Sequence, residues 1–259
     1  MQAEERRSGI AALLKSDKRV FVSELRRTYG VSEETIRRDL EKLEADGIAR
    51  RTYGGALLSE DEKTETPYDI RRRSNVEEKY AIARLAATLI EDGEYLMMDE
   101  SSTSFFVAGE LKGRKDLTVI TNSMEIVNEI AACPGWTVLC TGGQKRMSAP
   151  SFAGHQAESM VRSYHVDKAI ISCGALDIEA GFTDRHEDTA LIKRAMMASA
   201  RQVILVADHA KFDRVAFATI GDISRLSCIV TDVKPDARWQ EACDKYGVKL
   251  LYARGRNEE

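Results

Sequence analysis

The first part of the chain carries apolar residues at helical spacing, and a short alternating stretch follows them. Three predicted helices would each bury one stripe: Ile10, Leu13 and Leu14; Val22, Leu25 and Tyr29; Ile36, Leu40 and Leu43. Ser32 is a favourable N-cap for the third helix. Two β-type runs joined by Gly54 and Gly55 then predict a hairpin. Three helices followed by a hairpin are the elements of a winged helix-turn-helix.

Beyond residue 75 the pattern changes to short, continuous apolar runs that alternate with helical segments. The runs predict strands at residues 95–98, 117–121, 137–140, 169–172, 203–206, 228–231 and 248–251. The helical segments are residues 77–90, 103–111, 124–132 and 189–200. Continuous apolar strands between amphipathic helices are typical of a mainly parallel sheet that is covered on both faces. We therefore expect an α/β fold with an additional N-terminal winged helix-turn-helix.

Composition and charge sharpen this division. The 259-residue chain has 43% hydrophobic and 31% charged residues, which is typical of a globular protein. Residues 1–57 contain 12 Lys and Arg against 10 Asp and Glu, a net charge of +2, whereas the remainder contains 26 against 32, a net charge of −6. We expect a winged-helix domain at 1–57, a polar, acidic linker at 58–75 and a larger α/β domain at 76–259.

Several classes of protein are disfavoured by what the sequence lacks. The first residues are polar and resemble no signal peptide, and no apolar run approaches the ~18 residues that a membrane span needs. The five cysteines include no Cys-x-x-Cys pair, so we expect reduced thiols and no metal site. No Gly-x-Gly-x-x-Gly or Walker A sequence indicates a nucleotide. We expect a cytoplasmic protein without membrane contact, metal or cofactor.

The third predicted helix has chemistry suited to a DNA duplex. An α-helix fits the major groove, where Arg side chains reach guanine edges or phosphates, and hydroxyls beside the helix start bond phosphate. Basic residues of the hairpin suit phosphate or the minor groove. The candidate DNA-binding residues are Ser32, Glu33, Thr35, Arg37, Arg38, Lys42, Arg50, Arg51, Tyr53 and Gly54. The alternative is that Arg37 and Arg38 only pair with Glu33 and Glu34, four positions earlier.

These residues also carry a family resemblance. The string from Val31 to Glu44, together with Tyr53-Gly54-Gly55-Ala56, resembles the N-terminal signature of DeoR-type transcriptional regulators. The resemblance continues at residues 99–103, 121–123, 141–143 and 207–212. It implies a winged helix joined to a sensor domain similar to ribose-5-phosphate isomerase. It also implies an oligomeric repressor of carbohydrate operons that binds double-stranded operator DNA and responds to phosphorylated sugars or related metabolites.

Polar segments follow four of the predicted strands, where ligands of open α/β sheets bind. They offer hydroxyls and N–H groups at helix starts, an amide, carboxylates and cations, which together suit a phosphorylated sugar or polyol. The candidate effector-binding residues are Asp99, Ser101, Ser102, Thr103, Ser104, Thr121, Asn122, Ser123, Gly142, Gly143, Arg146, Asp208 and Lys211. Simpler explanations are helix capping by the hydroxyls and the amide, loop ordering by the carboxylates, and surface exposure of the cations.

Two loops depart from the family's usual pattern. Ser101 and Ser102 stand where Asp-x-Gly-Thr-Thr has its glycine and first threonine. A serine at the glycine position disfavours a positive φ and adds a hydroxyl, so we expect altered phosphate-loop geometry or a different effector. In the later loop, Ala210 and Asp213 replace the frequent Ser and Gly, and an inward-pointing Asp213 would disfavour a highly charged ligand.

Two functions of different classes follow. The first is a DNA-binding regulator, a repressor of a sugar or polyol catabolic operon. It would act as a homo-oligomer, a dimer or tetramer, on two-fold symmetric half-sites, with an effector that binds its states unequally. The alternative is a sugar-phosphate isomerase-like enzyme with an appended DNA-binding module, in which Lys211, Asp99 and Asp208 supply acid–base groups. No isomerase signature is recognisable, so we favour the regulator and expect no catalytic residue.

Overall fold

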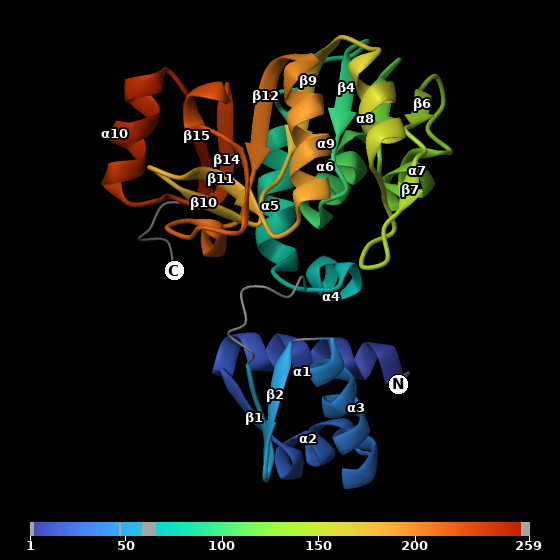
Figure 1. Cartoon of the computed structure of the whole chain (residues 1–259), viewed down its shortest axis with the longest axis vertical. Coiled ribbons are helices and arrows are strands. Elements are labelled where there is room, and N and C mark those ends of the chain that lie inside the picture. The colour runs from blue at the N-terminus through green and yellow to red at the C-terminus, as the bar shows by residue number, and fades with distance from the viewer. Residues whose placement is uncertain (1–2, 47, 59–65, 255–259) are drawn as a thin grey trace. The chain divides into compact units, whose positions relative to one another are not determined.

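The computed structural model describes residues 3–46, 48–58 and 66–254. These residues form two compact units, which divide between Ser74 and Asn75 (Figure 1). Each unit has a hydrophobic core of its own.

The N-terminal unit contains the three predicted helices and the predicted hairpin. Its elements are α1 (Ala3–Asp17), β1 (Arg19–Phe21), α2 (Val22–Tyr29), α3 (Glu33–Ala45), β2 (Ala49–Thr52), β3 (Gly55–Leu58) and α4 (Tyr68–Arg73). The apolar stripes pack against one another, and Ile10, Leu25 and Ile36 are fully buried where they meet. The sequence did not predict β1, which is too short to show a period and pairs with β3 in a sheet of order β1-β3-β2.

Gly55 explains how β1 reaches the hairpin. It lies opposite Phe21 in the antiparallel pairing of β1 with β3. A Cβ atom on Gly55 would lie only 1.9 Å from the carbonyl oxygen of Val20. Any side chain would therefore collide with the backbone of β1, and a glycine permits the close approach of the two strands.

Helix α4 lies in the segment 58–75, for which the sequence predicts a linker. Residues 59–65 of that segment lie outside the described residues. Residues Tyr68–Arg73 instead form a helix that packs on α1, with Ile70 buried in the N-terminal core. The Arg73 Nη1 donates to Ser8 Oγ at 3.0 Å, and Lys15 Nζ donates to Ser74 Oγ at 3.1 Å. This part of the segment therefore belongs to the N-terminal unit.

The second unit is built on a seven-stranded parallel sheet, which confirms the α/β fold class. Its strands are β4 (Tyr95–Met98), β5 (Thr118–Thr121), β6 (Thr137–Cys140), β9 (Val166–Ile171), β12 (Ala200–Val206), β14 (Cys228–Val233) and β15 (Lys249–Arg254). They lie in the order β15-β14-β12-β9-β4-β5-β6, and each corresponds to one of the seven predicted runs. Because all neighbouring pairs are parallel, the carboxyl ends of the seven strands share one edge of the sheet.

Helices cover both faces of this sheet (Figure 1). They are α5 (Val76–Ala87), α6 (Ser102–Glu110) and α7 (Met124–Ile130) on one face, and α8 (His155–Arg162), α9 (Glu187–Ala198) and α10 (Ala237–Tyr246) on the other. The strand side chains alternate accordingly. Ile170 and Ile204 pack with the first set, whereas Ala169, Ile171 and Leu205 pack with the second. The buried strands therefore read as continuous apolar runs.

Short elements that the sequence did not predict follow the carboxyl ends of β6, β9 and β12. The hairpin of β7 (Gln144–Lys145) and β8 (Phe152–Ala153) follows β6. A three-stranded sheet combines β10 (Ala175–Asp177), β11 (Gly181–Asp184) and β13 (Ala218–Gly221). Single helical turns are η1 (Leu111–Gly113), η2 (His209–Lys211) and η3 (Ile223–Arg225). These strands lack the continuous apolar runs that predict β4, β5 and β6, and the elements that follow β6, β9 and β12 build up the carboxyl edge of the sheet, whereas η1 precedes β5 and η3 precedes β14.

Candidate DNA-binding and effector sites

The recognition helix α3 begins as its sequence predicts. Ser32 is the N-cap, in an extended conformation, and its Oγ accepts a hydrogen bond from the Thr35 backbone N–H at 3.2 Å. The two hydroxyl oxygens of Ser32 and Thr35 lie 2.9 Å apart. Ile36, Leu40 and Leu43 are buried beneath the helix. The opposite face is therefore left to polar residues.

Arg37 and Arg38 lie on that exposed face. Their side chains are 52% and 76% exposed. Arg37 Nη2 lies 3.9 Å from Glu33 Oε2, and Arg38 Nε lies 3.3 Å from Glu34 Oε1. The i,i+4 pairs proposed as the alternative explanation are therefore present. Exposed pairs of this kind are weak and exchange readily for a phosphate oxygen, so pairing and DNA contact are compatible.

The wing, which is the hairpin of β2 and β3, carries one arginine, Arg51, that is hydrogen-bonded to α3. Glu44 accepts hydrogen bonds from the Arg51 backbone N–H at 2.9 Å and from its Nε at 2.8 Å, and Glu41 accepts from its Nη1 at 2.7 Å. The backbone N–H bond and then the guanidinium of Arg51 lower the pKa of Glu44. Arg51 thus anchors the wing on the recognition helix, while Arg50 and the fully exposed Tyr53 point to solvent, as do Lys42 and Gly54.

A buried ion pair joins α1 to the recognition helix. Arg6 Nε lies 2.5 Å from Asp39 Oδ2, and both side chains are almost fully buried. Arg7 approaches the other carboxylate oxygen of Asp39 at 3.7 Å. Asp39 is separated from Arg6 by 33 positions, so no local pattern in the sequence pairs them. This contact sets the position of α3 relative to α1.

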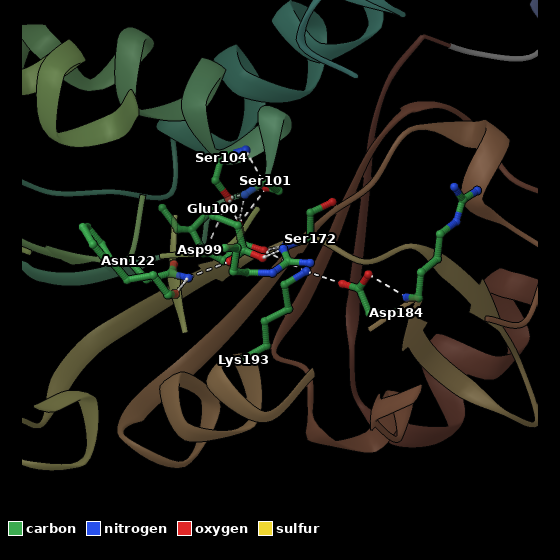
Figure 2. A network of polar contacts seen from close by, with 12 residues as sticks. Asp99, Glu100, Ser101, Ser104, Asn122, Ser172, Asp184 and Lys193 are labelled. Atoms are coloured by element: carbon green, nitrogen blue, oxygen red, sulfur yellow. Dashed lines mark hydrogen bonds and ion pairs between the residues drawn. The ribbon is translucent and has the colours of Figure 1, made fainter. Parts of the chain in front are cut away.

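In the second unit, the polar segments predicted for the effector meet at the carboxyl edge of the sheet. Figure 2 shows Asp99 and Glu100 after β4, Asn122 after β5 and Ser172 after β9, joined by hydrogen bonds. Asp99 is fully buried and lies at the centre. Its Oδ1 accepts from Ser101 Oγ at 2.7 Å and from Ser104 Oγ at 2.5 Å, and its Oδ2 accepts from the Ser172 backbone N–H at 2.9 Å.

The serine at position 101 adopts an ordinary backbone conformation. Its φ is −68°, so the expected conflict between a serine and a positive φ does not arise. Its hydroxyl caps α6 by accepting from the Ser104 backbone N–H at 3.0 Å. Ser102 and Thr103 are buried in the first turn of α6. The start of this helix therefore already faces a carboxylate of the chain itself, Asp99.

Lys193, Asp184 and Glu100, which the sequence did not single out, complete the cluster around Asp99. Lys193, from α9, lies 2.6 Å from Asp184 Oδ2 and 3.2 Å from Asp99 Oδ2 (Figure 2). Burial lowers the pKa of Lys193, but the carboxylates of Asp184 and Asp99 outweigh it and hold the pKa above its usual range. Helical spacing could have predicted that Lys193 is buried, because it lies on the same helix face as the buried Thr189 and Met197.

Glu100 is a third carboxylate of this edge and was not predicted either. Its Oε2 accepts from Asn122 Nδ2 at 2.9 Å, and its Oε1 lies 3.6 Å from Arg146 Nη1. Burial raises the pKa of Glu100, and the Asp99 carboxylate adds to this effect against the opposing cations of Lys193 and Arg146. The Arg146 side chain is only 8% exposed, which contradicts the alternative that it is a surface charge.

The loops after β5 and β6 are joined by backbone hydrogen bonds, in which the Met124 N–H donates to the Pro150 carbonyl and the Phe152 N–H donates to the Asn122 carbonyl, both at 2.9 Å. Ser123 caps α7 by accepting from the Ile126 N–H at 3.3 Å, and Thr121 Oγ1 accepts from the Ser123 N–H at 3.1 Å. Gly142 and Gly143 both have positive φ values. At Gly143 a Cβ would meet the Ala153 carbonyl oxygen at 2.9 Å. The two glycines thus shape the entry into the β7–β8 hairpin, which carries Arg146.

Asp208 and Lys211 lie in the η2 loop after β12. Asp208 is buried and caps η2 through the Ala210 N–H at 3.1 Å, which agrees with the loop-ordering explanation. Burial raises the pKa of the Cys173 thiol to about 12, and the charges of Lys211 and Lys193 both oppose this shift. Lys211 of the η2 loop and Lys193 of the Asp99 cluster therefore both influence the Cys173 thiol. The next residue but one after Lys211, Asp213, is mainly exposed and accepts from Trp239 Nε1 at 3.1 Å, so it faces α10 rather than the cluster.

A cavity of about 250 Å³ opens beside this edge. It lies between the β7–β8 hairpin and the start of α9, and its lining includes Lys145, Arg146, Ser148, Ala153, His186 and Asp188. Within the described ranges, three buried side-chain oxygen atoms of these elements and of the loop after β5 have no hydrogen-bond partner: Asn122 Oδ1, Ser151 Oγ and Thr189 Oγ1. Buried polar atoms are usually satisfied, so these three can accept partners from a ligand.

The residues that the structure describes contain no group of three or more His, Cys, Asp or Glu side chains arranged to hold a metal ion. None of their helices combines the length and the apolar character that crossing a membrane requires.

A winged helix whose recognition helix exposes two arginines, joined to a parallel α/β domain, defines a class of DNA-binding regulators. Residues 6–62 match the DeoR-like helix-turn-helix domain, and residues 74–233 match the DeoR C terminal sensor domain. The chain belongs to the DeoR family of transcriptional regulators, which confirms the resemblance seen in its sequence.

Relatives resemble the chain along almost its whole length. The HTH-type transcriptional repressor GlcR of Bacillus subtilis is 35% identical over 97% of this chain and 96% of its own. The putative aga operon transcriptional repressor of Escherichia coli O157:H7 is 34% identical over 95% and 93%. The glycerol-3-phosphate regulon repressor of Escherichia coli K12 is 29% identical over 96% and 99%. These relatives are regulators, which favours that class over an isomerase-like enzyme.

Solved structures resemble part of the chain at low identity. The ribose 5-phosphate isomerase A of Methanocaldococcus jannaschii is 16% identical with a TM-score of 0.41, over 54% of this chain and 55% of its own. The eIF2B delta of Chaetomium thermophilum is 18% identical with a TM-score of 0.46, over 61% and 56%.

Proposed function

We propose that the protein represses a sugar or polyol catabolic operon and that a phosphorylated sugar or polyol controls its affinity for operator DNA. The observation that carries this proposal is the exposed pair Arg37 and Arg38 on a capped recognition helix. The same chain gathers hydroxyl, amide, carboxylate and cationic groups at the carboxyl edge of a parallel sheet, where such folds bind ligands.

In this proposal α3 lies in the major groove and the wing lies along the neighbouring backbone. Arg37 and Arg38 exchange their glutamate partners for guanine edges or phosphates, and Ser32 and Thr35 bond phosphate at the helix start. Arg50 and Tyr53 extend the contact through the wing, whereas Arg51 holds the wing in place. Glu33, Lys42 and Gly54 complete the proposed surface.

Effector control requires a ligand that binds the DNA-competent and incompetent states unequally. We propose a homo-oligomer, a dimer or tetramer, whose paired winged helices read two-fold symmetric half-sites. The effector would occupy the edge formed by Asp99, the α6 serines, Asn122 and Arg146, with Lys211 beside it, and bias the separation of the paired helices. Relatives named for the aga operon and the glycerol-3-phosphate regulon support a carbohydrate-related effector.

A titration of DNA from the gene's own upstream region, followed by fluorescence anisotropy, tests the proposal. The wild-type protein should bind at low salt, and a panel of sugar and polyol monophosphates should change its affinity. Absence of DNA binding at low salt would refute the regulator, and an affinity unaffected by the whole panel would refute the effector. An aldose-phosphate isomerase assay on the same protein should show no turnover.

A further inference from the structure

Glu100 is a buried charged group that the proposed function leaves unexplained. It lies two residues after the end of β4, is only 3% exposed, and contacts residues from two other elements, Asn122 after β5 and Arg146 in the β7–β8 hairpin. Burying a carboxylate costs free energy unless its partners compensate it. The chain compensates it with one amide N–H at 2.9 Å and one guanidinium at 3.6 Å.

We call the part of the sheet edge where Asp99, Glu100, Asp184, Lys193 and Arg146 meet the inner edge. Its charges do not favour an anion. The carboxylates of Asp99, Glu100 and Asp184 face two cations, Lys193 and Arg146. Each cation already lies within 4 Å of a carboxylate, and the start of α6 already faces Asp99. A phosphate placed here would meet three carboxylates in a buried region, where charges interact strongly. Hydroxyl groups, by contrast, can donate to carboxylate oxygens.

We propose that Glu100 is a specificity-determining residue of the effector site. It blocks an anion from Arg146 and Asn122 and reserves the inner edge for hydroxyl groups of a polyol or sugar. The phosphate of the effector then lies in the cavity between the β7–β8 hairpin and the start of α9, against the exposed Lys145 rather than against Arg146, which also lines this cavity. This inference rests on the proposed function and adds the orientation of the ligand.

The unpartnered atoms agree with a hydroxyl-bearing ligand. Asn122 donates two hydrogen bonds through Nδ2, to Glu100 and to the Phe152 carbonyl, which leaves Oδ1 as an acceptor. Ser151 and Thr189 contribute buried hydroxyls from the hairpin and from the first turn of α9. The Asn122 Oδ1 acceptor suits an alcohol group, which can donate to it, better than a phosphate dianion, which can only accept, and the two hydroxyls can donate to or accept from the same alcohol groups.

The substitution Glu100→Gln tests the charge directly, because glutamine keeps the shape and can still accept from Asn122. The probe is inorganic phosphate, titrated calorimetrically into the full-length protein at neutral pH. We expect Glu100→Gln to bind phosphate about tenfold more tightly than wild type, because Arg146 loses its carboxylate partner. The matched control is Glu94→Gln, which removes a partly buried carboxylate paired with Lys168 at the opposite end of β4. It should leave phosphate affinity unchanged.

An affinity for phosphate that Glu100→Gln does not raise, including no detectable binding by either protein, would overturn the inference. A second arm compares ribitol and sorbitol with their monophosphates on both proteins. Glu100→Gln should shift the ratio of the two affinities towards the monophosphate by about tenfold. If wild type binds none of these compounds, the proposed effector class fails, while the phosphate titration still decides the role of Glu100.

Discussion

The ion pairs of the recognition helix and those of the sheet edge use the same side-chain types but differ in their contact with water. Arg37 and Arg38 pair with glutamates on an open helix face and remain more than half exposed. Lys193 lies between Asp99 and Asp184, and these side chains are 13% exposed or less. Exposed pairs contribute little to stability and exchange partners easily, whereas a buried pair is costly to break.

This difference suits the two tasks. A surface that binds a phosphate backbone must release its own carboxylates at low cost. A site that distinguishes one small polar ligand from another benefits from groups that are already desolvated and fixed, because a mismatched ligand then leaves buried partners unsatisfied. In the proposed function, the same side-chain types would therefore give general affinity for DNA in one unit and selectivity for a small ligand in the other.

The largest expected effect comes from removing the buried cation. Lys193→Met leaves Asp99 and Asp184 without their shared partner and should lower the free energy of unfolding by about 3–5 kcal/mol. Urea unfolding followed by tryptophan fluorescence measures it, because both tryptophans, Trp136 and Trp239, lie in the second unit. Lys112→Met is the control, since Lys112 pairs with Glu129 at an exposed site. Equal losses in the two variants would contradict the comparison.

The buried ion pair of Arg6 and Asp39 in the N-terminal unit tests whether burial, rather than position in the second unit, decides how much stability is lost when an ion pair is broken. Asp39→Asn keeps the shape but removes the charge that Arg6 contacts at 2.5 Å. We expect a loss of about 1.5–3 kcal/mol in the stability of this unit, measured by hydrogen exchange of the α3 amides. Glu34→Gln, on the exposed face of the same helix, should change the exchange little. If both variants behaved alike, burial would not be the deciding factor.

Removing Arg38, which pairs with Glu34 on the exposed face of α3, should weaken DNA binding far more than it lowers the stability of the protein. Arg38→Ala should weaken operator binding about tenfold and reduce the slope of log affinity against log salt by about 1 if it contacts a phosphate. Arg162→Ala is a matched control, because Arg162 is also half exposed and pairs with Glu158 at i,i+4, but in α8. Its DNA affinity should equal that of wild type. A similar loss in both variants would indicate a non-specific effect of charge.

The sequence could predict the recognition helix and the strands, but it could not predict the contacts at the sheet edge. The stripe of Ile36, Leu40 and Leu43, the Ser32 cap and the seven apolar strands are signals within a few residues of one another. The site at the sheet edge combines residues that are far apart in sequence, and Lys193 meets Asp99 only after β4 and α9 pack on the same sheet. Periodicity located the loops but could not show that Asp99 would face the start of α6 or that Glu100 would point inward.

The smallest expected effect is the contribution of Glu100 to the pH dependence of the free energy of unfolding. Because burial raises its pKa in the folded protein, the folded state binds this proton more tightly than the unfolded state does. Its contribution therefore lowers the stability of the second unit as pH rises through the raised pKa, and the loss is relieved as pH falls. The charged groups that face it are Asp99, Lys193 and Arg146, and they remain in place in Glu100→Gln.

The difference in unfolding free energy between Glu100→Gln and wild type isolates this contribution, since the other titrating groups cancel. Relative to wild type, Glu100→Gln should gain stability as the pH rises from the ordinary range of a glutamate to pH 7.5, on top of a pH-independent cost of leaving Arg146 without its carboxylate partner. Glu94→Gln, which lacks the burial of Glu100, should show no such gain. A difference of constant size at all pH values would mean that packing, rather than the buried charge, distinguishes the two side chains, and the inner edge would then impose no charge selection on a ligand.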